Sequence, residues 1–414
     1  MEIQHDVGCG DEGTASFAID AVRMAHRILL VQDSAFMDYL PFTKPTLDED
    51  TIQGVVEVLR SGWLASGPNV QLLEKVLSDY HGGRITRTLT SATGGLEVAL
   101  QMCGIGHGDE VVTPAMSFAA TPNVILRVGA RPVFVDVDLA TRNLDLNRVA
   151  AAITPRTKAI MPVHFAGLPV DMDALYALAE RHHLRVIEDA AHAIGSSWQG
   201  RKIGSFGDIV SFSFHPNKNM TTIEGGALTF AFADEVKQFD LLRFHGISRD
   251  AEGNMDVSLA GGKYNLSDVA ARVGLGQLGQ LDGFNAKRLE LAGHYFEHLA
   301  SDPACLLPAR GHAGDEAGHS WHMFAPLLPL EQLTISRKQF VEAMHQRGIG
   351  VGIHYPALHL FSLYRELGYQ EGDFPNAERI GRETVTLPLF PAMTMADVER
   401  VCTAVQEIIL ESRK

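Results

Sequence analysis

Residues 186–228 read VIEDAAHAIGSSWQGRKIGSFGDIVSFSFHPNKNMTTIEGGAL and contain two short apolar runs. The first run ends at Asp189, and the second, at 209–214, opens into a loop that holds Lys218. Short β-rich runs that alternate with helix-length stretches are typical of a mostly parallel sheet with helices on both faces. Ligands of such a sheet bind beyond the carboxyl ends of its strands, so Asp189 and Lys218 are predicted to lie at one crevice.

The same alternation extends from residue 87 to residue 230. We expect strands at 110–113, 132–135, 158–163, 185–188, 209–214 and 227–230, with helices near 94–102, 119–128, 171–182 and 235–244. Two helices, at 266–281 and 286–299, are expected to join this region to a smaller α+β domain. That domain is predicted to have strands at 322–328 and 350–354 and helices at 337–346 and 396–410.

The pattern predicts three segments along the chain. Regular patterning begins at about Met37, so residues 1–36 are interpreted as an N-terminal extension that is either disordered or precedes the true start. Residues 37–282 are predicted to form a large ligand-binding domain, and residues 283–414 a small C-terminal domain. A chain of 414 residues, of which 46% are hydrophobic, is long enough to bury the cores of two domains.

Composition excludes several classes of protein. The formal charge of -15 provides no basic field for nucleic acid, so any anionic ligand must be held by local donors. The four cysteines are widely spaced, which indicates a reducing compartment rather than a disulfide framework. The sequence shows neither a signal peptide nor an apolar run of the roughly 20 residues that a membrane span needs. We therefore expect a cytoplasmic protein.

Asp189 and Lys218 are the residues whose type and position point most clearly to chemistry. A carboxylate at the end of an apolar strand can hold a positive charge in a poorly solvated crevice, although Asp is equally suited to capping a following helix. Most lysines are solvated at the surface. A lysine between apolar strands, however, would have a depressed pKa, and its amine would then be a usable nucleophile.

Two further segments suit a planar phosphorylated ligand. Residues 90–98, TSATGGLEV, open a helix with small residues, so donors near Thr93 and Gly94 can hold a phosphate. Plain helix capping is the commoner use of such a sequence. Phe118 follows the strand expected at 110–113 and can stack on a flat ring, with core packing as its alternative. Neither segment is decisive by itself.

Together these segments provide a phosphate cradle, a stacking face, a carboxylate for a ring nitrogen and a lysine for an aldehyde, in that chain order. Pyridoxal 5′-phosphate (PLP) requires all four. The chain resembles the DegT/DnrJ/StrS family of sugar aminotransferases from about residue 40 to the C-terminus. The resemblance is carried by SATGGLEVAL (91–100), GDEVVTPAMSF (108–118), GIGVGIHYPALH (348–359) and, most specifically, the stretch at 186–228.

This resemblance implies the type I fold of aspartate aminotransferase, an α/β fold with a mostly parallel central sheet and a smaller α+β C-terminal domain. It also implies that Lys218 carries PLP covalently and later moves a proton between substrate and cofactor, while Asp189 pairs with the pyridinium nitrogen. The other implied cofactor residues are Thr93, Gly94 and Ser213 at the phosphate, Phe118 against the ring, and His192 close by.

By the same resemblance, Asn265 reaches the cofactor phosphate of a neighbouring subunit, which predicts a homodimer with shared active sites. Capping of the helix expected near residue 266 is the alternative role for this asparagine. His354 and His359 are candidates for the substrate side of the site. We expect no metal, because the two histidines lack a third suitably spaced ligand.

The reaction implied by the resemblance is a ping-pong transamination. L-Glutamate donates its amino group and leaves as 2-oxoglutarate, and the 4-keto carbon of a nucleotide-linked sugar accepts the group. The sub-family likeness is closest to the enzymes that make UDP-4-amino-4-deoxy-L-arabinose for lipid A modification. A UDP-4-keto-pentose, or another 4-keto-deoxysugar nucleotide used for lipopolysaccharide, other surface sugars or secondary metabolites, is therefore the expected substrate.

Two rival functions share this fold. A PLP-dependent sugar dehydratase of the family would carry histidine in place of Lys218. A non-catalytic sensor that only binds PLP or a sugar nucleotide would not need both Asp189 and Lys218. Transamination is favoured because this chain has both residues.

Overall fold

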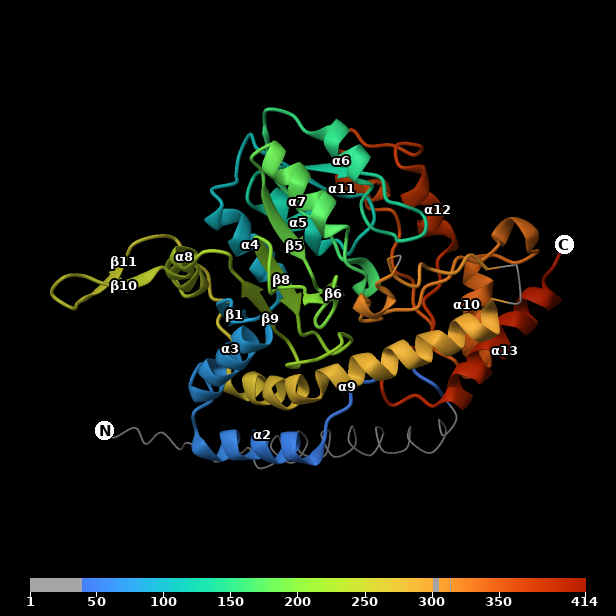
Figure 1. Ribbon diagram of the computed structural model, residues 1–414, viewed down its shortest axis with the longest axis horizontal. Coiled ribbons are helices and arrows are strands. Elements are labelled where there is room, and N and C mark those ends of the chain that lie inside the picture. The colour runs from blue at the N-terminus through green and yellow to red at the C-terminus, as the bar shows by residue number, and fades with distance from the viewer. Residues whose placement is uncertain (1–38, 301–304, 313) are drawn as a thin grey trace, which may run out of the picture. The chain divides into compact units, whose positions relative to one another are not determined.

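The structure is a computed structural model that describes residues 39–300, 305–312 and 314–414 (Figure 1). The extension predicted at residues 1–36 lies outside the described residues. Residues 41–414 form one compact unit. Within the described ranges, no helix combines the length and the apolar character needed to cross a membrane.

A seven-stranded sheet lies at the centre of this unit, with the strand order β1-β9-β8-β5-β4-β2-β3. Neighbouring strands are parallel except where β9 pairs antiparallel with β1 and β8. This arrangement confirms the predicted α/β fold with a mostly parallel sheet. The strands are β1 (Thr86–Leu89), β2 (Glu110–Pro114), β3 (Arg131–Val135), β4 (Thr157–Ile160), β5 (Arg185–Asp189), β8 (Ile209–Ser213) and β9 (Gly226–Thr229).

Two short antiparallel ribbons stand apart from the central sheet. One pairs β6 (Ser197–Trp198) with β7 (Arg201–Lys202), and the other pairs β10 (Ile247–Arg249) with β11 (Met255–Val257). All six strands expected between residues 87 and 230 are present in the central sheet. The sequence did not predict β1 as a separate strand.

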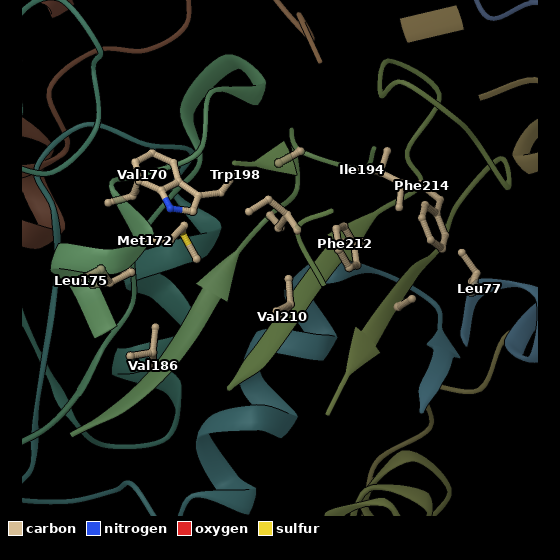
Figure 2. Close-up of a cluster of buried hydrophobic side chains, with 14 of the residues drawn as sticks. Leu77, Val170, Met172, Leu175, Val186, Ile194, Trp198, Val210, Phe212 and Phe214 are labelled. Carbon is tan, nitrogen blue, oxygen red and sulfur yellow. The ribbon is translucent and has the colours of Figure 1, made fainter. Parts of the chain in front are cut away.

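Both faces of the sheet are covered by helices, which explains why β2, β8 and β9 are buried at every position. Successive residues of β5 illustrate the alternation, because Val186 belongs to one buried cluster and Ile187 to another. The first cluster includes Met172, Trp198 and Phe212, which Figure 2 shows together with Val186. By the same alternation, the side chains of neighbouring residues at the end of β5 point to opposite faces.

Side-chain caps define where several helices begin. The carboxylates of Asp48 and Asp171 and the hydroxyl of Ser267 each accept a backbone N–H from the first turn of the helix that follows. The α-helices are α2 (Glu49–Ser61), α3 (Pro68–Tyr80), α4 (Ala92–Met102), α5 (Ala120–Arg127), α6 (Leu146–Ala152), α7 (Met172–Arg181), α8 (Ala233–Arg243), α9 (Asp268–Leu299), α10 (Arg337–Gln346), α11 (Ser362–Arg365), α12 (Pro375–Glu383) and α13 (Met395–Glu411).

Helix α9 corrects the prediction of two helices at 266–281 and 286–299. It runs without interruption beneath the sheet towards α10 and α13 (Figure 1) and packs against α2, α3 and α13. Gly283 weakens a helix by only about 1 kcal/mol, a cost that tertiary packing outweighs. The predicted domain boundary at 282 therefore falls inside α9, and the division into two domains remains a proposal.

The region after α9 contains less β structure than predicted. The segments 322–328 and 350–354 form isolated bridges, Phe324 with Leu387, Leu327 with Thr384 and Gly352 with Thr386, rather than regular strands. Extended apolar residues there pack against helices without a continuous ladder. The helices predicted at 337–346 and 396–410 are confirmed as α10 and α13.

Candidate active site

A cavity of about 310 Å³ lies at the carboxyl ends of the strands. Its wall combines the first turn of α4, the segments that follow β2, β4, β5 and β8, and residues 354–355 from the C-terminal part of the chain. A larger depression of about 510 Å³ lies at the amino ends of β5 and β8, and no lysine lines it. The smaller cavity is therefore the candidate active site, as the rule for parallel sheets predicts.

Lys218 lies on the loop after β8 and lines this cavity. A turn holds the loop in place, because the N–H of Lys218 donates to the carbonyl of His215 over 2.9 Å. Burial lowers the pKa of the Lys218 amine to about 8, while the nearby carboxylate of Asp189 acts in the opposite direction. The solvated-surface alternative is therefore wrong, and the neutral, nucleophilic form of the amine becomes abundant as pH rises through about 8.

Asp189 ends β5 and faces the same cavity, with only 5% of its surface exposed. Its Oδ2 accepts the hydroxyl of Thr121 at 2.8 Å, and its Oδ1 accepts the N–H of Ala191 at 3.2 Å. Burial raises the pKa of Asp189, which these hydrogen bonds and Lys218 oppose. A turn rather than a helix follows Asp189, so the capping alternative is wrong.

The start of α4 places Thr93 on the cavity wall but leaves Gly94 outside it. Ser91 caps this helix, and its hydroxyl accepts the N–H of Gly94 over 3.1 Å. The N–H groups of Ala92 and Thr93 lie in the first turn, where no helix carbonyl is available to them. A side-chain cap and free first-turn N–H donors thus coexist here, and the Gly94 donor expected at the phosphate is already used by Ser91. Ser213, at the end of β8, also lines the cavity.

Phe118 stands at the rim of the cavity with 59% of its surface exposed, so its core-packing alternative is wrong. The ring of Tyr355 lies beside it, with the two centroids 5.9 Å apart. Both rings line the cavity, although the two residues are far apart in the sequence. Phe118 is therefore positioned to contact a flat ligand.

His192 and His354 also line the cavity. The ring of His192 accepts the N–H of Ala166 at Nδ1 over 3.3 Å, and burial lowers its pKa well below the usual value. His354 makes a 2.9 Å contact with the hydroxyl of Thr386 and stacks on Phe42. Burial lowers the pKa of His354 to about 4. Both rings are therefore neutral at physiological pH, and Nε2 of His354 can exchange a hydrogen bond with a ligand.

The structure does not bring His359 to the cavity, which corrects its predicted place on the substrate side. Its side chain is completely buried, and Nε2 lies 3.0 Å from Oε1 of Glu378. Both residues are close to Phe374 in the packing around α12, as the 4.7 Å separation of the His359 and Phe374 ring centroids shows. The spacing of His354 and His359 in the sequence does not reveal which of the two side chains faces the cavity.

Asn265 likewise does not line the cavity of its own chain. Its side chain donates to the hydroxyl of Ser66 over 2.6 Å and contacts the amine of Lys263. The cap of α9 is Ser267, so the capping alternative for Asn265 is wrong. A surface position outside its own cavity is compatible with the proposed reach towards a second subunit.

Sequence reasoning missed Tyr355, Thr121 and Ser117. The phenol oxygen of Tyr355 lies 3.3 Å from Nε2 of His192, and the hydroxyls of Ser117 and Thr121 are 2.9 Å apart. Ser117 immediately precedes Phe118, and Tyr355 immediately follows His354. This adjacency to predicted site residues was the only signal in the sequence for Ser117 and Tyr355, and Thr121 had none.

Comparison with known proteins decides the family. The model of the DegT/DnrJ/EryC1/StrS aminotransferase family matches residues 45–406. The chain belongs to this family. An uncharacterized protein of Methanocaldococcus jannaschii is 39% identical over 384 residues, which cover 91% of this chain and 99% of that protein. The match to the family model confirms the family resemblance stated from the motifs.

Solved structures of similar proteins share the fold of this DegT/DnrJ/EryC1/StrS family member. A protein from Streptococcus pneumoniae in its pyridoxamine-phosphate (PMP) form has a TM-score of 0.84 and 31% identity, with 90% of this chain and 99% of that chain covered. The same protein is also known in its PLP form. Helicobacter pylori PseC, an aminotransferase involved in the biosynthesis of pseudoaminic acid, has a TM-score of 0.85 and 28% identity over 90% of this chain and all of that chain.

The family is PLP-dependent, and the residues of the cavity fit this cofactor. The cavity contains a buried amine for an aldehyde, a buried carboxylate for a ring nitrogen, and a helix start with N–H donors for a phosphate. No other lysine lines it. The type I fold and the PLP cofactor expected from the sequence are thus confirmed.

Proposed function

We propose that this protein transfers the amino group of L-glutamate to the 4-keto carbon of a nucleotide-linked sugar. A UDP-4-keto-pentose or another 4-keto-deoxysugar nucleotide is the proposed acceptor, and 2-oxoglutarate is the keto acid released. The proposal rests on the presence of Lys218 and Asp189 in one cavity of a chain that belongs to a sugar aminotransferase family. The product would enter lipopolysaccharide, other surface sugars or secondary metabolites.

In this proposal each cavity residue has a distinct task. When bound, PLP supplies an electron sink for the carbanion that forms at the reacting carbon. Lys218 holds the cofactor and moves a proton through its amine, whose lowered pKa suits a general base near neutral pH. Asp189 keeps the ring nitrogen protonated by charge pairing, which a buried carboxylate does strongly because little solvent screens it.

The remaining residues of the cavity would bind and orient the cofactor and the sugar substrate. Thr93, Ser213 and the first-turn N–H groups of α4 would hold the phosphate, and Phe118 would cover one face of the ring. His192 lines the cavity and would lie beside the cofactor ring, and His354 would donate to or accept from the sugar. These neutral groups avoid burying additional charge, which suits an acidic protein that binds anionic ligands through local donors.

A homodimer is part of the proposal, with Asn265 reaching the cofactor phosphate of the second subunit. The side chain of Asn265 is half-buried and lies outside the cavity of its own chain. The expected location is the cytoplasm, where nucleotide sugars and glutamate are available. Analytical ultracentrifugation, together with cofactor retention in an Asn265→Ala variant, would test the shared site.

The decisive experiment uses the purified protein with PLP, glutamate and a panel of 4-keto and 3-keto sugar nucleotides. Formation of 2-oxoglutarate together with an amino sugar nucleotide supports the proposal, and the panel identifies the base and sugar. Loss of water from the sugar without consumption of glutamate would indicate a dehydratase instead. Tight ligand binding without any turnover would indicate a sensor.

A further inference from the structure

The carboxylate of Asp189 does not stand alone in the wall of the cavity. Its Oδ2 is 2.8 Å from the hydroxyl of Thr121, and that hydroxyl is 2.9 Å from the hydroxyl of Ser117. All three side chains are buried, with exposed fractions of 5%, 0% and 3% respectively. Ser117 and Asp189 also line the cavity, whereas Thr121 lies behind them.

The carboxylate of Asp189, at one end of this chain of hydrogen bonds, decides which hydroxyl donates in each bond. An ionised carboxylate only accepts, so the O–H of Thr121 must donate to Asp189. The oxygen of Thr121 is then left as the acceptor for the O–H of Ser117. Each hydroxyl therefore has a fixed role, and polarisation of one bond strengthens the next.

The position of Thr121 is set by the packing of α5 on the sheet. Thr121 lies in the first turn of α5, and its N–H donates to the carbonyl of Phe118 over 3.2 Å. The same five-residue segment, 117–121, therefore supplies the exposed ring of Phe118 and the donor to Asp189. Because Asp189 and Ile187 point to the same face of β5, the carboxylate meets the face that α5 covers.

We propose that Thr121, supported by Ser117, is a positioning residue that holds the carboxylate of Asp189 ionised and aimed at the ring nitrogen of the cofactor. Desolvation disfavours a buried carboxylate anion, and a neutral acid could not pair with a pyridinium N–H. A charge-assisted hydrogen bond from Thr121 offsets this penalty. The inference rests on the role proposed for Asp189 but on no particular sugar substrate.

The test measures cofactor binding rather than catalysis. Apoprotein is titrated with PLP and with its 1-deaza analogue, in which a C–H group replaces the ring nitrogen, and dissociation constants are obtained for the wild type and for Thr121→Val. We expect the substitution to weaken PLP binding on the order of tenfold or more, the usual worth of a hydrogen bond to a charged group. Binding of the deaza analogue should change by less than about twofold, because it makes no ion pair with Asp189.

Two further variants separate positioning from packing. Thr121→Ser retains the hydroxyl and should restore PLP affinity to near the wild-type value. Thr229→Val is the matched control, since Thr229 is equally buried and its hydroxyl bonds to Thr86 and His81 instead of to the acid. That control should leave PLP affinity unchanged.

Several outcomes would overturn the inference. Equal losses of affinity for PLP and the deaza analogue in Thr121→Val would show that Thr121 acts only through packing, and no loss for PLP would show that it does not act on Asp189. Equal dissociation constants of the wild-type protein for PLP and the deaza analogue would show that Asp189 does not pair with the ring nitrogen. Absence of sugar transamination by a protein that behaves as expected in the binding test would refute only the proposed function.

Discussion

The imidazole of His192 and the phenol of Tyr355 meet at the wall of the cavity, with Nε2 and Oη 3.3 Å apart although 163 residues separate them. Because the N–H of Ala166 donates to Nδ1, Nε2 of the neutral ring carries the proton and donates to the phenol oxygen. The O–H of Tyr355 is then oriented as a donor for a ligand. The end of β5 and the C-terminal part of the chain thus share one hydrogen-bonded wall.

Replacement of Lys218 by alanine is expected to reduce turnover on the order of a thousandfold or more, because no other lysine lines the cavity. The visible absorbance of the covalently bound cofactor should disappear as well. Steady-state kinetics and absorbance spectra check both effects, with the exposed Lys158→Ala as a control. Borohydride reduction of the wild type followed by peptide mapping locates the lysine that carries the cofactor. A pyridoxyl group on a lysine other than Lys218 would contradict the assignment.

Replacement of Asp189 by asparagine should preserve the fold and lower the rate of transamination by roughly a hundredfold, because a neutral amide cannot offset the charge of a protonated ring nitrogen. Circular dichroism checks the fold, and single-turnover kinetics with glutamate check the rate. Asp189→Glu is the conservative control, since it keeps the charge. Near wild-type rates for Asp189→Asn would show that the carboxylate has no role in the chemistry.

Attachment of PLP to the apoprotein should depend on pH through the Lys218 amine. Its pKa is lowered to about 8, so the neutral, nucleophilic amine becomes more abundant as pH rises through about 8 and its population then levels off. Stopped-flow measurement of the cofactor absorbance across this range would reveal the plateau. A rate that continues to rise towards the ordinary lysine pKa of 10.5 would mean that burial does not perturb the amine.

His354 and His359 should respond differently to substitution by alanine. His354 lines the cavity, so His354→Ala is expected to raise the KM for the sugar nucleotide several-fold while PLP affinity is preserved. His359 is buried against Glu378, so His359→Ala should leave that KM near the wild-type value but lower the free energy of unfolding by about 3 kcal/mol. Kinetics and urea unfolding of both variants provide the comparison. An equal increase in KM for the two variants would show that His359 also contributes to binding of the sugar nucleotide.

Much of the central sheet was predictable because its strands are short apolar runs separated by amphipathic helices. The error at α9 arose because Asp282 and Gly283 resemble a helix end, whereas packing against α2, α3 and α13 carries the helix through. The segment 322–328 was misread for a related reason. Its apolar residues are buried, but burial alone does not supply a neighbouring strand.

The amino-acid sequence alone determined where most strands of the central sheet lie along the chain, the lysine and the carboxylate at their ends, and the family, since strand periodicity and motif spacing are local properties of the chain. Only the tertiary structure decided that His354 and not His359 faces the cavity, and that Thr121 and Tyr355 belong to its wall. Side-chain direction in irregular segments, and contacts between residues far apart in the chain, depend on how helices pack against the sheet. No local pattern encodes that packing.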